Sequence, residues 1–261
     1  MIDASHDGFD GAAAIFAEHA KTLRGYIRYQ IVRRNLEPFL TGKKLSILDI
    51  GGGSGIDAAW LASQGHTVLL IEPSSEQFTY AERRFNFFLT TDQRQRITLK
   101  QISLEEIPAR QQFDVVLLHG VAMFQPEPTK FITSAFRFVK PGGLFSLVEK
   151  GYYGAEARAI REHRLKQVAN LHASQRVINT LKLSTYAFKP EEIEALLLKH
   201  NFKIIQWTGV RVIAHDMNLL VEDVDKDELE TILETEFVQG ADPGIRTQGQ
   251  LLHFISRKPK A

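Results

Sequence analysis

Residues 48–74, LDIGGGSGIDAAWLASQGHTVLLIEPS, place four glycines within five positions, between two short apolar runs. The runs KLSILDI (44–50) and TVLLIE (67–72) are typical of β-strands, and IDAAWLASQG (56–65) between them predicts a helix that stops at Gly65. A glycine-rich turn between a strand and a helix lies at the carboxyl edge of a parallel sheet, where open α/β sheets bind ligands. The stretch therefore predicts a ligand that lies close to bare backbone.

Three glycine-rich loops can be compared with this stretch. A phosphate-binding Walker loop requires a lysine after its last glycine, and none follows Gly55, so that loop is excluded. A dinucleotide-binding loop, G-x-G-x-x-G/A, fits Gly53, Gly55 and Ala58. The pattern D/E-x-G-x-G-x-G fits in full from Asp49 to Gly55. By this loop, and by KPGG at 140–143, residues 45–149 resemble the class I S-adenosylmethionine-dependent methyltransferases.

The charges around the loop favour a cationic ligand over a phosphate. Asp57 falls in the first turn of the predicted helix, where its carboxylate complements the helix dipole and would repel a pyrophosphate. S-adenosylmethionine carries a sulfonium and an ammonium group and no phosphate, so an acidic neighbourhood suits it. Glu72, at the end of the second strand, can accept hydrogen bonds from two ribose hydroxyls, as it would in a nicotinamide dinucleotide site. Glu72 therefore predicts an adenosine ligand without separating these two ligands.

Strand and helix patterns continue to alternate along the chain. Strands are predicted over 96–102, 113–120, 144–150, 203–214 and 251–258, with helices over 75–89, 128–139, 189–202 and 221–237. This alternation predicts an α/β fold, a doubly wound and mostly parallel seven-stranded sheet of the Rossmann-like kind that methyltransferases have. Residues 9–40 predict a helical cap, assigned to 1–40, and residues 150–189 predict a basic helical insertion after the fifth strand. We expect residues 1–261 to form a single domain.

Composition narrows the class of protein further. The 261 residues carry a net charge of +1 and no cysteine, which excludes disulfides, thiolate metal sites and a cysteine nucleophile. No histidine spacing typical of a metal site is present. The first residues do not resemble a signal peptide, and no apolar run approaches the roughly 20 residues that span a bilayer. We expect a cytoplasmic protein with no bound metal and no membrane partner.

Motifs outside the loop resemble one branch, the bacterial tRNA 5-carboxymethoxyuridine methyltransferases. They are RGYIRYQIVRRNL (24–36), LLHGVAMF (117–124), KPGGLFSL (140–147), WTGVRV (207–212) and LLHFISRKP (251–259). Enzymes of this family esterify the carboxylate of a modified wobble uridine, so the resemblance implies tRNA as a partner. It also implies S-adenosyl-L-methionine as the cofactor, bound by Arg28, Asp49, Gly51, Gly53, Gly55, Glu72, Ser103 and His119.

The resemblance implies a distinct role for several of these residues. Arg28 would pair with the methionine carboxylate of the cofactor, Glu72 would bind the ribose, and Ser103 or its neighbours would meet the adenine edge. His119, at the end of the fourth strand, is a candidate catalytic base, but a histidine that only shapes the cofactor pocket is the favoured alternative. A carboxylate is nucleophilic at neutral pH, so this acceptor would need no base.

The basic insertion supplies candidates for contact with the acceptor. Arginines suit a phosphate backbone and aromatic rings suit a splayed base, although a solvated amphipathic helix has a similar composition. The candidate substrate-binding residues are Tyr152, Arg158, Arg161, Arg164 and Lys189 of the insertion, and Arg211 outside it. Gln250 departs from the family pattern, because an arginine is typical at that position.

Two alternative functions remain open from the sequence alone. One is a small-molecule O- or N-methyltransferase in which the insertion forms a lid. The other is an NAD-binding oxidoreductase, or a nucleotide-binding protein that carries out no chemistry.

Overall fold

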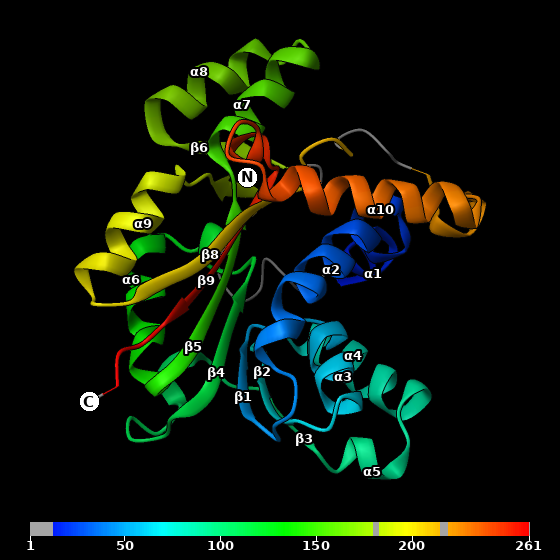
Figure 1. Ribbon diagram of the computed structural model, residues 1–261, viewed down its shortest axis with the longest axis vertical. Coiled ribbons are helices and arrows are strands. Elements are labelled where there is room, and N and C mark those ends of the chain that lie inside the picture. The colour runs from blue at the N-terminus through cyan, green and yellow to red at the C-terminus, as the bar shows by residue number, and fades with distance from the viewer. Residues whose placement is uncertain (1–12, 180–182, 215–218, 261) are drawn as a thin grey trace.

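The alternating patterns fold into one seven-stranded sheet with helices on both faces, in a computed structural model that describes residues 13–179, 183–214 and 219–260 (Figure 1). The strands of this sheet are β1 (Ser46–Ile50), β2 (Thr67–Ile71), β3 (Ile97–Lys100), β4 (Phe113–His119), β5 (Val139–Lys150), β8 (Lys203–Val210) and β9 (Leu251–Arg257). They lie in the order β3-β2-β1-β4-β5-β9-β8, and β9 runs antiparallel to both of its neighbours. The predicted α/β fold is confirmed.

Helices bury apolar side chains against both faces of the sheet. The helices are α1 (Ala13–Lys21), α2 (Leu23–Leu36), α3 (Ile56–Ser63), α4 (Ser75–Phe88), α5 (Thr91–Arg94), α6 (Pro128–Ala135), α7 (Tyr152–Arg161), α8 (Leu165–Ser174), α9 (Pro190–Lys199) and α10 (Lys226–Ala241). One face packs against α6 and α9, and the other against α2, α3 and α4 (Figure 1). Within the described part of the chain, no helix combines the length and apolar character needed to cross a bilayer.

The strand order determines where a ligand can bind. From β1 the chain proceeds outward on one side through β2 and β3, and on the other side through β4 and β5. The connections on the two sides of β1 therefore diverge, which opens a crevice at the carboxyl ends of β1 and β4. The glycine loop follows β1, and His119 ends β4 beside it.

The amino-terminal segment differs from the single helical stretch predicted over 9–40, of which residues 9–12 lie outside the described residues. Two helices form instead, because the Thr22 hydroxyl accepts a hydrogen bond from the backbone N–H of Gly25 at 3.2 Å and so begins α2. Gly25 allows the close approach, since a Cβ there would lie 2.1 Å from the carbonyl oxygen of His19. The break turns the pocket-facing residues of α1 and α2 toward the same crevice.

The insertion after β5 is only partly helical, so the prediction of a helical 150–189 is wrong at its carboxyl end. Helices α7 and α8 form, but β6 (Arg176–Ile178) and β7 (Ser184–Tyr186) pair as an antiparallel ribbon. Alternation explains the ribbon, because Val177 and Thr185 are buried while their neighbours are more exposed. A bridge from Gly151 to Phe188 ties the insertion to the end of β5. The insertion therefore stands over the carboxyl edge of the sheet (Figure 1).

Candidate active site

The glycine loop after β1 adopts the left-handed conformation at three positions. Gly51, Gly53 and Gly55 have φ angles of 60°, 55° and 73°, which side chains disfavour. Gly51 and Gly53 line a pocket, as predicted. Gly55 lies outside it and serves packing, since a Cβ there would lie 2.5 Å from the Phe85 ring of α4. The loop thus exposes its backbone to the pocket at Gly51 and Gly53, and it packs tightly against α4 at Gly55.

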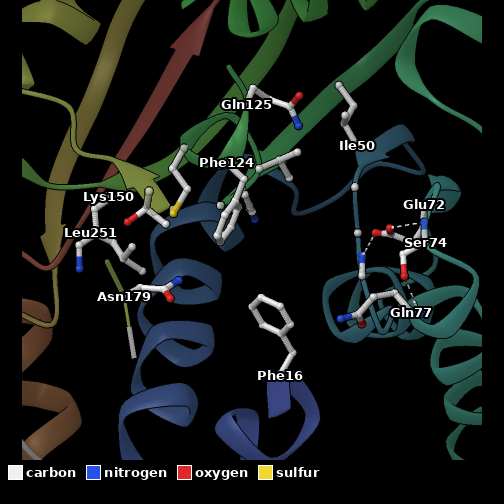
Figure 2. A pocket seen from close by; sticks show the side chains of 18 of the residues that line it. Phe16, Ile50, Glu72, Ser74, Gln77, Phe124, Gln125, Lys150, Asn179 and Leu251 are labelled. Atoms are coloured by element: carbon white, nitrogen blue, oxygen red, sulfur yellow. Dashed lines mark hydrogen bonds between the residues drawn. The ribbon is translucent and has the colours of Figure 1, made fainter. Parts of the chain in front are cut away.

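Glu72, directly after β2, fixes the loop from the opposite side. Its carboxylate is buried, and it accepts hydrogen bonds from the backbone N–H of Gly53 at 2.9 Å and that of Ser74 at 3.0 Å. Figure 2 shows Glu72 with Ser74 and Gln77 on one side of the pocket, and Lys150, Asn179 and Leu251 on the other side. Glu72 therefore lies at the pocket wall, bonded to the glycine loop.

Two further carboxylates, Asp49 and Asp57, crowd the same end of the pocket. Burial, followed by the charges of Asp57 and Glu72, raises the pKa of Asp49 well above its usual range. Burial also acts to raise the pKa of Asp57, but the hydrogen bond with His119 and the nearby charges outweigh it and bring that pKa to about 2. One oxygen of each carboxylate, Asp49 Oδ2 and Asp57 Oδ1, has no hydrogen-bond partner among the described residues. This end of the pocket suits a ligand with positive charge.

His119 lines the pocket but bonds to the protein through both ring nitrogens. Its Nδ1 lies 3.2 Å from Asp57 Oδ2 and its Nε2 lies 2.8 Å from the Ser146 hydroxyl. Burial lowers the pKa of His119, against the opposing effect of Asp57. Neither ring nitrogen is left to accept a proton from an acceptor, so the geometry favours the histidine that shapes the pocket over the catalytic base.

Arg28 crosses the pocket from α2 to the end of β4. Its guanidinium donates to the backbone carbonyl of His119 at 3.2 Å and lies 4.6 Å from the centre of the Tyr29 ring. Ser103, before the 3-10 turn that follows β3, also lines the pocket. Both residues therefore line the pocket.

The pocket measures about 610 Å³ and continues from the glycine loop to the insertion. Its far end is strongly basic, and we call the five side chains there the cation cluster: Arg24, Lys150, Arg158, Arg164 and Arg211. Three of the predicted substrate-binding residues, Arg158, Arg164 and Arg211, belong to this cluster. The pocket therefore has an acidic end and a basic end.

Three other substrate-binding predictions fall outside the pocket. Arg161 is exposed at the end of α7, and the Lys189 ammonium lies 4.9 Å from the centre of the Tyr152 ring, away from the pocket wall. Tyr152 is buried in the base of the insertion, so its ring is not available to stack on a base. For these three residues the structure gives no support to a direct role.

Several pocket residues were missed by the sequence analysis, above all Lys150 and Arg24. Lys150 ends β5 at the same sheet edge as Glu72 and His119, and Arg24 precedes Arg28 by one helical turn. Both placements could have been deduced from the predicted elements. Gln250 is also explained, because its side chain accepts from Lys150 Nζ at 3.5 Å and donates to the carbonyl of Gly154 at 2.6 Å.

The loop before α10 positions Arg211. Glu236 of α10 is fully buried, and its carboxylate accepts the backbone N–H groups of Val212, Ile213 and Ala214 at 3.0, 2.7 and 2.7 Å. Arg211 itself has a φ of 57°, and its Nε has no hydrogen-bond partner among the described residues. Burial and the nearby arginines lower its pKa to about 9. Keeping this buried guanidinium charged at the pocket wall therefore costs the folded protein stability.

Comparison with known proteins agrees with this geometry. Residues 48–147 match the family model "Methyltransferase domain". Over its length the chain is similar to the tRNA 5-carboxymethoxyuridine methyltransferase of Escherichia coli (strain K12), with 26% identity over 97% of each chain. It is 35% identical to the ubiquinone biosynthesis O-methyltransferase of Pseudomonas fluorescens (strain SBW25) over 42% of this chain and 47% of that one.

Among solved structures, the fold resembles that of the Burkholderia thailandensis 1,6-didemethyltoxoflavin-N1-methyltransferase, which was crystallised with S-adenosylhomocysteine. The TM-score is 0.59 at 15% identity, over 98% of this chain and 88% of that one. At this identity the likeness concerns the fold.

Proposed function

Because this chain is an S-adenosylmethionine-dependent methyltransferase, we propose that it esterifies the carboxylate of a modified uridine at the wobble position of tRNA. The cofactor end of the pocket fits S-adenosylmethionine. The carboxyl groups of Asp49 and Asp57 suit its cationic groups, Arg28 suits its carboxylate, and Glu72 suits its ribose. These residues hold and orient the cofactor, which supplies a methyl group already activated on a sulfonium.

The cation cluster is the observation that carries the choice of an anionic acceptor. Burial and the charges of the neighbouring arginines lower the pKa of the Lys150 ammonium to about 7 and that of the Arg211 guanidinium to about 9. Arg158 and Arg164 share Glu162 as an ion-pair partner, whereas Glu236 near Arg211 is occupied by backbone N–H groups. Buried like charges destabilise a protein unless a counter-ion relieves them. A bound carboxylate would supply that counter-ion.

A carboxylate acceptor also agrees with the geometry of His119, because both of its ring nitrogens already bond to the protein. The acceptor oxygen attacks the methyl carbon, a C–O bond forms, the C–S bond breaks and its electron pair stays on sulfur. No proton has to be removed, so His119 can remain bonded to Asp57 and Ser146 throughout. The residues of the chain need only align the two partners and exclude water.

The relatives support tRNA as the carrier of that carboxylate. The similarity to the tRNA-modifying enzyme covers 97% of this chain and so includes the insertion, whereas the similarity to the ubiquinone enzyme covers only 42%. Ile160 of α7 and Leu165 of α8 are exposed on the insertion, as suits a surface that contacts nucleotides.

Mass spectrometry of nucleosides tests this proposal. Transfer RNA from cells that lack the protein should carry the free carboxylate at the wobble uridine, and purified protein with S-adenosylmethionine should convert it to the methyl ester. Mild alkali should remove the added methyl group, because an ester saponifies. A methyl group that survives alkali, or methylation of a small-molecule fraction without any of tRNA, would show that the acceptor is a different one.

The pH dependence of acceptor binding provides a test at Lys150. Below pH 7 the ammonium is charged and attracts the carboxylate, and above pH 7 it loses its proton and the attraction. We therefore expect the KM for tRNA to rise about tenfold between pH 6 and pH 8.5 at constant ionic strength. Lys150→Met should abolish this rise, while the matched variant Lys189→Met should keep it. A rise that persists in Lys150→Met would assign it to another group.

A further inference from the structure

A hydrogen-bonded network of buried polar side chains crosses the sheet beneath the cofactor end of the pocket. It begins at Asp57 in α3 and passes through His119 in β4, Ser146 in β5 and His253 in β9 to Asn35 in α2. The separations are 3.2 Å from Asp57 Oδ2 to His119 Nδ1, 2.8 Å from His119 Nε2 to Ser146 Oγ, 2.9 Å from Ser146 Oγ to His253 Nε2, and 3.3 Å from His253 Nδ1 to Asn35 Nδ2. Thr208 and Gln206 of β8 end it, at 2.8 Å from Asn35 Nδ2 and 3.4 Å from Asn35 Oδ1.

Because Asp57 is ionised, the hydrogen bonds of this network all have one direction. A carboxylate only accepts hydrogen bonds, so His119 donates from Nδ1 and its Nε2 carries a lone pair. The Ser146 hydroxyl must then donate to His119 Nε2 and accept from His253 Nε2–H. His253 Nδ1 in turn accepts from the Asn35 amide, whose second N–H reaches Thr208. The opposite direction would set the bare Nδ1 of His119 against the carboxylate.

The residues of this network are buried, so the direction of each hydrogen bond matters. Ser146, His253, Asn35 and Thr208 are at most 3% exposed, so a lost hydrogen bond cannot be replaced by bulk water. The His119 and His253 rings meet edge to face, with their centres 5.8 Å apart and the Ser146 hydroxyl between their Nε2 atoms. Burial lowers the pKa of His119 and brings the pKa of His253 well below its usual range, so both rings are neutral at pH 7. A neutral pair can be held in two different tautomers.

We propose that Ser146 and His253 are positioning residues, which complete the hydrogen bonding of the Nδ1–H tautomer of His119 and thereby keep the Asp57 carboxylate in place at the cofactor end of the pocket. Neither residue lines the pocket. They act through His119, which bonds to Asp57 Oδ2, while Asp57 Oδ1 lies 3.7 Å from Arg33 Nε. The sequence patterns that identified the glycine loop do not include them. This role concerns cofactor binding alone and holds for any methyl acceptor.

Histidine tautomers can be read directly by nitrogen NMR, in protein without cofactor. Wild-type protein should show His119 as the Nδ1–H form and His253 as the Nε2–H form. In Ser146→Ala, His253 should become a mixture of tautomers, because its N–H has lost its acceptor. Finding His119 as the Nε2–H form in wild-type protein would overturn the proposal, and this result depends on no variant that could fail to fold.

Cofactor affinity, measured by calorimetry, gives the second readout. Ser146→Ala and His253→Phe should each raise the Kd for S-adenosylmethionine about tenfold. His253→Gln should stay within about twofold of wild type, because its amide can donate to Ser146 as the ring did. The matched control is Ser256→Ala, which removes an equally buried hydroxyl of β9 that, among the described residues, bonds to the carbonyl of Phe145 alone. It should lower thermal stability and leave the Kd unchanged.

A purely structural role would give a different pattern. Ser146→Ala and Ser256→Ala would then both lower the unfolding temperature, both keep the Kd of wild type, and leave the His119 tautomer as it was. That combination would overturn the proposal. Loss of affinity in His253→Phe without recovery in His253→Gln would also overturn it, since the hydrogen-bond donor would not be what matters.

Discussion

Replacing Arg211 by methionine is expected to raise the KM for the acceptor about 100-fold and to leave the Kd for S-adenosylmethionine unchanged. The guanidinium lies at the basic end of the pocket, buried and with an unpartnered Nε, whereas the cofactor residues lie at the acidic end. An acceptor carboxylate that enters this end would lose a charge-assisted hydrogen bond in the variant. Steady-state kinetics with tRNA and calorimetry with the cofactor measure the two constants separately.

The same variant should not lose stability, which separates a binding role from a structural one. Burial and the charges of Arg24 and Arg158 oppose the charge on Arg211, so its removal relieves repulsion in the folded state. Methionine has no greater difficulty than arginine with a φ of 57°, so the backbone cost is unchanged. We therefore expect an unfolding temperature equal to or above that of wild type.

Arg246→Met is the matched control for this experiment. Arg246 lies outside the pocket, where its guanidinium lies 3.7 Å from the centre of the Trp207 ring and donates to the carbonyl of Trp207 at 3.4 Å. Its replacement should lower stability and keep the KM. If Arg211→Met instead loses stability and keeps the KM, the cation cluster is not the acceptor site and the proposed acceptor loses its main support.

The fold was predictable because hydrophobic pattern and turn chemistry agree along most of the chain. Continuous apolar runs such as VVLL in β4 indicate strands that are covered on both faces, and the glycine loop fixes the first strand-to-helix turn. The errors lie where short-range signals conflict. Three-residue strands such as β6 are too short for a periodic signal, and the Thr22 break interrupts an otherwise continuous helical pattern.

The two ends of the pocket differed in how far sequence could predict them. The acidic end follows from strand ends and one loop, since residues that close β1, β2 and β4 must meet at one sheet edge. The basic end depends on where the insertion and the loop after β8 fold back, and no local pattern determines that. Hence Arg211 lies at the pocket wall, whereas Arg161 and Lys189 lie outside the pocket.

Local sequence patterns do not predict the hydrogen-bonded network beneath the pocket. Asn35 and Thr208 are 173 residues apart in sequence, and Ser146 and His253 are 107 apart. Each of these residues fits a strand or helix without any partner, so nothing in its neighbourhood signals a network. Only the register of β4, β5, β9 and β8 brings the side chains together on one face.

Glu72→Gln is the second change for which a large effect is expected, a rise of about 100-fold in the Kd for S-adenosylmethionine. The carboxylate accepts from Gly53 and Ser74 through its two oxygens, so the amide of glutamine must turn its NH₂ group toward one of two N–H donors. The loop should loosen and the ribose should lose a charged acceptor. Glu105→Gln, at an exposed acid that lines the same pocket, is the control and should change the Kd less than about threefold.

Loosening of the loop and loss of the ribose contact can be separated with a modified ligand. An S-adenosylhomocysteine analogue without the ribose 2′-hydroxyl should bind wild-type protein about tenfold more weakly than the parent compound. In Glu72→Gln the two ligands should bind almost equally, because the acceptor for that hydroxyl has already been lost. If the analogue is disfavoured by the same factor in both proteins, Glu72 only braces the loop, and the ribose is bound by another group.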